Sequence, residues 1–146
     1  MRIITASLDF LDELVPLFDA YRVFYKQDSN LSGVTAFLTE RLQKKDSFIF
    51  LALDDQNKGL GFTQLYPSFS SVSMKPLYIL NDLYVAENAR NMGVGAELME
   101  YAKYFTKEKG GKGLVLETAL DNPAQKLYRR LGWIKDSAVN HYTWEV

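Results

Sequence analysis

Cysteine is absent from this chain, and only one histidine, His141, is present. Without cysteine there is no disulfide framework, no thiolate metal site and no cysteine nucleophile that could carry an acyl group. A single histidine excludes most zinc chemistry and argues against a serine–histidine mechanism. We therefore expect a protein with no metal site.

An excess of charge of one sign and long hydrophobic runs are also absent. The formal net charge is -1, whereas general nucleic-acid binders usually carry a basic excess. No apolar run reaches the roughly 18 residues that a bilayer span requires, and the N-terminus lacks a signal-like core. We expect a cytoplasmic protein that binds neither nucleic acid nor membrane.

The size and composition are those of one globular domain. The chain has 146 residues, 47% of them hydrophobic, which is enough to bury a core without crosslinks. The predicted order is strand, helices, three strands, helix, strand, helix and two strands. This order predicts an α/β (α+β) domain over residues 1–146 with a mixed sheet.

Apolar periodicity and turn residues predict the individual elements. We expect strands at 3–4, 47–53, 60–66, 77–85, 114–118, 133–134 and 142–146, and helices from 7, from 32, at 94–109 and at 122–132. Pro16 is expected to kink the first helix or to start a second piece. The serine-rich stretch 67–75 is expected to be a loop.

The most informative segment is Arg90–Gly95, which follows an apolar strand and opens a helix. The first N–H groups of a helix have no partner within it, and the helix dipole adds partial positive charge there. Gly93 and Gly95 remove side chains that would keep a ligand away. This turn therefore predicts a site for a phosphorylated ligand.

Two common phosphate motifs do not fit this turn. A P-loop needs Lys-Ser or Lys-Thr directly after its glycines, but Ala96-Glu97 follows Gly95. A dinucleotide fingerprint needs a third glycine where this chain has Leu98. The arrangement that remains is an arginine, two residues and then Gly-x-Gly.

With this pattern, the chain resembles the GNAT superfamily of N-acetyltransferases. The resemblance covers nearly the whole sequence and is strongest in Leu83-Tyr84-Val85, in Arg90–Gly95 and in the run Asn122–Trp133. It implies the GNAT fold, a mixed sheet of about six to seven strands flanked by about four helices. It also implies a V-shaped splay between the strands at 77–85 and 114–118, and acetyl-coenzyme A as co-substrate.

The resemblance further implies residue roles for the coenzyme. The pyrophosphate would be held by the N–H groups of Arg90, Asn91, Met92, Gly93, Val94, Gly95 and Ala96. The pantetheine arm would pair with Leu83, Tyr84 and Val85. Asn122 and Ala124 would lie near the sulfur, and Tyr128 matches the tyrosine that protonates the leaving thiolate. Only Pro123 separates Asn122 from Ala124, so Asp121 could hold the aligned asparagine position instead.

The general base stays open at this stage. In the central strand, alternation places Tyr78, Leu80, Asp82 and Tyr84 on one face. A carboxylate among apolar residues is unusual because its burial is costly. Asp82 is therefore the first candidate for a base or amine anchor, and Glu117 on the neighbouring strand is the second.

The acceptor is expected between the first two helices and the sheet, against Tyr21, Arg22, Phe24, Tyr25 and Asp82. Aromatic rings and a carboxylate suit a cationic amine. We predict direct transfer of acetyl from acetyl-coenzyme A to a primary amine, on a small molecule, amino acid, polyamine or peptide. The alternatives are a non-catalytic acyl-coenzyme A sensor or a protein-interaction subunit. A homodimer joined through the terminal strands is a further hypothesis.

Overall fold

One five-stranded sheet forms the centre of the protein, whose computed structural model describes all residues from 1 to 146. β1 (Arg2–Thr5), β2 (Phe48–Leu53), β3 (Gly59–Ser70) and β4 (Lys75–Val85) pair antiparallel in chain order. β5 (Leu114–Val115) then pairs parallel to β4. The predicted mixed sheet is confirmed.

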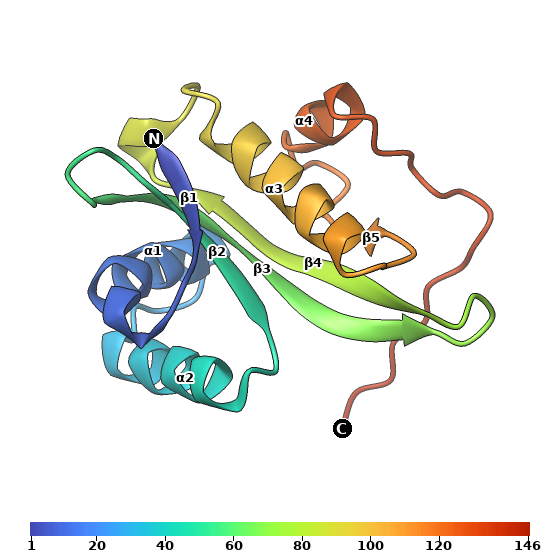
Figure 1. The fold of residues 1–146 in the computed structure, drawn as a ribbon, viewed down its shortest axis with the longest axis horizontal. Coiled ribbons are helices and arrows are strands. Elements are labelled where there is room, and N and C mark those ends of the chain that lie inside the picture. The colour runs from blue at the N-terminus through green and yellow to red at the C-terminus, as the bar shows by residue number, and fades with distance from the viewer.

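Four α-helices cover the two faces of this sheet (Figure 1). α1 (Leu11–Phe24) and α2 (Leu31–Lys44) lie on one face, and α3 (Val94–Glu108) lies on the other, with the short α4 (Gln125–Arg130) beyond it. Two 3-10 turns, η1 (Leu8–Phe10) and η2 (Glu87–Ala89), precede α1 and α3. None of these helices combines the length and apolarity that crossing a bilayer requires.

The sheet separates two hydrophobic cores. Along β2, Ile49 and Leu51 pack toward α1 and α2, whereas Phe50 and Ala52 pack toward α3. Successive side chains of a strand point to opposite faces, so a strand covered on both sides must be apolar throughout. This explains why residues 48–53 form an unbroken hydrophobic run rather than an alternating one.

The loop expected at 67–75 is wrong, because β3 and β4 continue through it as a long hairpin. Pro67 pairs with Tyr78, and only residues 71–74 form the turn. Proline cannot donate to a ladder and is confined to strands with a free side. β3 has such a side here, because its pairing with β2 ends at Leu65.

The strands expected at 133–134 and 142–146 are also wrong, and the strand expected at 114–118 shortens to two residues. The sheet therefore has five strands and not six or seven. Residues 132–146 contain neither helix nor strand, and His141 is exposed. The first helix is not divided at Pro16 either, since α1 runs through it from Leu11 to Phe24.

Candidate functional site

A cavity of about 450 Å³, the main cleft, lies where β4 and the chain after β5 diverge. Pairing between these strands stops at Ile79 and Val115, so the predicted splay is confirmed. The residues beyond that point form opposite walls of the cleft, and the end of α1, the turn before α3, α3 itself, and α4 with the loop before it contribute the rest. The main cleft is lined by Tyr21, Phe24, Tyr25, Leu80, Asn81, Leu83–Val85, Ala89–Asn91, Gly93–Ala96, Leu116–Thr118, Asn122–Ala124, Leu127, Tyr128 and Arg130.

A row of free backbone amides lies at the start of α3. None of the N–H groups from Asn91 to Ala96 donates a hydrogen bond within the protein, and the first that does is Glu97, to the Gly93 carbonyl at 3.0 Å. Gly93 has φ of 83°, a left-handed conformation that glycine adopts without strain. A Cβ on Gly95 would meet the Leu127 and Val85 side chains at 3.4 and 3.6 Å. The turn thus presents bare backbone to the cleft.

Two arginines line the main cleft together with this amide row. The Arg90 Nε donates to the Val85 carbonyl at 3.3 Å, and its guanidinium lies 5.9 Å from the centroid of the Tyr84 ring. Arg130, on α4, lines the same cleft. Sequence reasoning missed Arg130, although its position two residues after Tyr128 was a usable signal. Cations and helix-terminal amides together favour an anion.

Tyr128 reaches the main cleft from α4. Its half-buried ring lies 6.2 Å from that of Trp133. Burial raises the pKa of the Tyr128 phenol, while the nearby Thr118 hydroxyl acts in the opposite direction. The phenol therefore stays protonated at neutral pH and can donate a proton. At the start of α4, the Asn122 Oδ1 accepts from the Ala124 N–H at 2.9 Å.

We expected Asp82 to share a face of β4 with Tyr78 and Leu80. This prediction is wrong, because Asp82 lies on the opposite face. β4 carries a bulge at Asn81: Gln64 pairs with Asp82, but Leu65 pairs with Leu80. One extra residue reverses the sides to which later side chains point. Tyr78 and Leu80 accordingly pack toward α3, whereas Asp82 turns toward α1 and α2.

Asp82 is only 4% exposed and is held by side-chain amides. Gln64 Nε2 donates to its Oδ2 at 2.7 Å, and Asn81 Nδ2 donates to its Oδ1 at 3.1 Å. Gln64 is itself bound by the Ser47 hydroxyl at 2.9 Å and donates to the Tyr66 oxygen at 3.1 Å. Sequence reasoning missed this network; a glutamine within the apolar stretch of β3 was the signal for it.

Burial and the Asp82 carboxylate act together on two neighbouring phenols. They raise the pKa of Tyr66 to about 12, with burial the larger cause. The same two causes, in the same order, hold the pKa of Tyr21 well above its ordinary value. Both phenols are therefore neutral at physiological pH.

A second cavity, the side cavity, also of about 450 Å³, opens over Asp82 between α1, α2 and the sheet. It adjoins the main cleft at Tyr21 and Asn81, which line both. Of the expected acceptor residues, Tyr21, Phe24 and Tyr25 line the main cleft, whereas Tyr21, Arg22 and Asp82 line the side cavity. The side cavity is lined by Phe18, Tyr21, Arg22, Asn30, Gly33, Val34, Phe37, Tyr66, Asn81 and Asp82.

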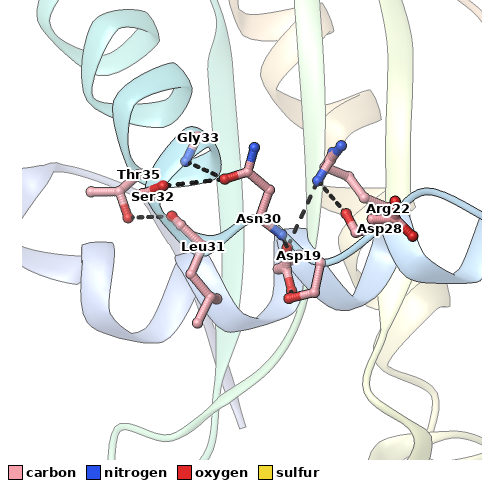
Figure 2. Close-up of polar contacts among 9 residues, drawn as sticks. Asp19, Arg22, Asp28, Asn30, Leu31, Ser32, Gly33 and Thr35 are labelled. Atoms are coloured by element: carbon pink, nitrogen blue, oxygen red, sulfur yellow. Dashed lines mark hydrogen bonds and ion pairs between the residues drawn. The ribbon is translucent and has the colours of Figure 1, made fainter.

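A buried carboxylate on α1 fixes one wall of the side cavity (Figure 2). Asp19 accepts from the Ser29 hydroxyl at 2.6 Å and from the Asn30 N–H at 2.8 Å, and Arg22 lies 3.8 Å away. The Ser29 hydrogen bond lowers the pKa of Asp19 most, the Asn30 N–H and then Arg22 lower it less, and together they outweigh the opposing effect of burial. Asn30 in turn caps α2 by accepting from the Gly33 N–H at 2.9 Å. Asn30 is thus the N-cap, and the helix that we expected from residue 32 begins at Leu31.

Comparison with known proteins yields one consistent family. The model described as Acetyltransferase (GNAT) family matches residues 13–133. The chain is 46% identical over 130 residues to the uncharacterized N-acetyltransferase YhfO of Bacillus subtilis, covering 88% of this chain and 87% of that protein. A probable acetyltransferase of Haemophilus influenzae is 35% identical over 119 residues, with 82% of each chain covered. The crystal structure of a probable acetyltransferase superposes with a TM-score of 0.95 at 44% identity, covering 100% of this chain and 98% of the other.

Proposed function

This chain belongs to the GNAT family and is an N-acetyltransferase, and we propose that it moves acetyl from acetyl-coenzyme A directly to a small cationic primary amine. One observation carries the proposal: the free amides of α3 and the Tyr128 phenol line one cleft. That cleft adjoins a second cavity with a buried carboxylate. The proposed diphosphate site and proton donor share the main cleft, and the proposed cation site lies in the cavity that adjoins it at Tyr21 and Asn81.

The residues of the main cleft fit coenzyme A. The amides from Asn91 to Ala96, flanked by Arg90 and Arg130, suit its pyrophosphate. The edge of β4 from Leu83 to Val85 has no strand partner on the cleft side, because β5 ends at Val115. An unpaired strand edge can bind an extended, peptide-like arm through its backbone groups. Asn122 and Ala124 line the cleft near Tyr128 and so lie at the thiol end of that arm.

Bound acetyl-coenzyme A would supply a thioester, whose carbonyl an amine can attack with loss of the thiolate. Tyr128 would donate a proton to the departing sulfur, since its raised pKa keeps the phenol protonated. An N–H on the free edge of β4 near Val85 would stabilise negative charge on the carbonyl oxygen. Holding both substrates in adjoining cavities removes the entropic cost of their encounter, which is worth several kcal/mol.

The acceptor occupies the side cavity, with its ammonium group directed at Asp82. Phe18, Phe37 and Tyr66 line the same cavity as that carboxylate, and aromatic faces attract cations. Arg22 at the rim disfavours a second positive charge there. A compact monoamine or amino acid therefore fits better than a long polyamine. Asp82 binds the amine, and either Asp82 or the more exposed Glu117, on the opposite cleft wall, removes its proton.

A thiol-release assay tests this proposal. The chain contains no cysteine, so a thiol reagent reports free coenzyme A without background from the protein. We expect transfer to small amines and amino acids, with weaker transfer to aminoglycosides, spermidine and peptide N-termini. Absence of release with every amine, together with absence of heat on titration with coenzyme A, would refute it.

Two charge-neutral variants identify the residue that handles the amine. Asp82→Asn keeps the shape and one acceptor, so loss of the ammonium anchor should raise the amine KM by about one to two orders of magnitude. Glu117→Gln should leave that KM unchanged. Whichever variant abolishes the acid limb of the kcat profile marks the base. If neither variant changes KM or the profile, the acceptor binds elsewhere.

A further inference from the structure

The main cleft and the side cavity share only two wall residues, Tyr21 and Asn81. The proposed function, on which this inference rests, puts the thioester in the main cleft and the amine near Asp82, which lines only the side cavity. An attacking nitrogen needs to lie within about 3–3.5 Å of the carbonyl carbon. The reacting nitrogen therefore belongs at the junction of the two cavities, beside Tyr21 and Asn81.

Asn81 is the residue that the bulge inserts into β4. It has no partner across the ladder, since Gln64 pairs with Asp82 and Leu65 pairs with Leu80. Asn81 is exposed, whereas Leu80 and Asp82 on either side of it are buried. In a regular strand each side chain points to one face of the sheet. The extra residue instead places an accessible polar side chain where the two cavities meet.

The side-chain amide of Asn81 has one end held and one end free. Its Nδ2 donates to the Asp82 Oδ1 at 3.1 Å, whereas its Oδ1 accepts no hydrogen bond within the protein. The other side-chain amide of the side cavity belongs to Asn30, whose Oδ1 already accepts from the Gly33 N–H at 2.9 Å and the Ser32 hydroxyl at 3.2 Å (Figure 2). An amide oxygen with both lone pairs available is therefore found in this cavity only at Asn81.

Aromatic rings hold the opposite side of the junction. The Tyr21 ring centroid lies 5.0 Å from that of Tyr25 and 5.9 Å from that of Phe62. It also lies 6.3 Å from the Tyr84 ring. These contacts fix the Tyr21 side chain, and aromatic faces attract cations. An ammonium group with an apolar body therefore suits the junction, and the free oxygen of Asn81 is available for its N–H bonds.

We propose that Asn81 is a specificity-determining residue, whose Oδ1 accepts one N–H of the reacting amine while Asp82 accepts a second. The amine nitrogen then has one position left, besides the bond to its own carbon, for attack on the thioester. In a primary ammonium this position carries a hydrogen, which leaves as a proton to the base. In an N-methyl amine the methyl group fills this position, unless one of the two hydrogen bonds is given up. The pair therefore selects primary amines.

Calorimetry tests this selection without turnover. Phenethylamine and N-methylphenethylamine are titrated into the full chain saturated with coenzyme A, which has no acetyl group to transfer. We expect the wild type to bind the primary amine at least about fivefold more tightly, because the N-methyl compound gives up one hydrogen bond or directs its methyl group at the coenzyme. Equal Kd values for the two amines, or no heat from either, would overturn the inference.

Two variants separate direct contact from an effect through Asp82. Asn81→Leu keeps the approximate size and removes the amide, so phenethylamine should bind about tenfold more weakly and the ratio of the two Kd values should approach one. Gln64→Leu also removes a donor from Asp82, but Gln64 lines neither cavity, so this ratio should stay at the wild-type value. A wild-type ratio in Asn81→Leu contradicts a contact between Asn81 and the amine.

The proposed function is judged by other measurements. Coenzyme A affinity, from the same calorimeter, shows that each variant is folded, and thiol release reports transfer. A chain that releases thiol with primary amines but keeps its ratio in Asn81→Leu loses this inference alone. A chain with the expected ratios and no thiol release keeps the amine selection and loses the transfer reaction.

Discussion

Replacing Tyr128 with phenylalanine removes one oxygen from the main cleft and nothing else. The ring, its packing against Trp133 and the α4 backbone remain, so coenzyme A affinity should change by less than about threefold. A positioned general acid typically contributes 10²–10⁴-fold, which corresponds to about 2.7–5.4 kcal/mol of transition-state stabilisation. We therefore expect kcat to fall by that factor with little change in KM for either substrate.

The pH dependence makes this prediction sharper. Burial raises the pKa of Tyr128 above its ordinary value of about 10, so the acid stays protonated across the usual assay range. The wild-type kcat should show no alkaline decline from this group below about pH 10. Tyr101→Phe is the matched control, because Tyr101 packs on Phe50 with ring centroids 4.9 Å apart and does not line the cleft. If Tyr128→Phe stays within about threefold of wild type, Tyr128 is not the acid.

Three further predictions concern the turn, α1 and the buried network. Gly93→Ala and Gly110→Ala each place a side chain at positive φ with open space around it, so both should lose about 1–2 kcal/mol of unfolding free energy in urea. Only Gly93→Ala should weaken coenzyme A binding, as measured by calorimetry. If Gly110→Ala weakens binding equally, the amide row does not bind the coenzyme. Asp19→Asn should cost about 1–3 kcal/mol at pH 7. Folding lowers the pKa of Asp19 below 3.8, so the carboxylate adds to the free energy of unfolding above that pH and loses this contribution as the pH falls through the folded pKa. The difference in free energy of unfolding between wild type and Asp19→Asn should therefore shrink in acid. A difference that stays constant from pH 7 to pH 3 contradicts this. Gln64→Leu should cost about 2–3 kcal/mol by leaving Asp82 Oδ2 without its donor, and an unchanged urea midpoint would show that water replaces the amide.

Local signals in the chain were sufficient for most of the architecture. The strands expected at 47–53 and 60–66 and the helix expected at 94–109 depend on neighbouring residues, and each of them forms. The failures have tertiary causes. Pro67 is compatible with a strand only because β2 does not extend beside it. Residues 142–146 carry a strand pattern, but a strand forms only where a partner edge is available to it.

The candidate site likewise combines a part that local sequence specifies with a part that depends on the fold. By itself the sequence determined the turn of unpaired amides before α3, because such amides follow from the order Arg-Asn-Met-Gly-Val-Gly at a helix start and need no distant contact. Only the tertiary structure decided which face of the sheet Asp82 lies on. One bulge at Asn81, invisible to alternation, rotates Asp82 from the α3 face to the α1 and α2 face. There it meets Gln64, a partner eighteen residues away along the chain, and a buried carboxylate needs such a partner because water cannot solvate it.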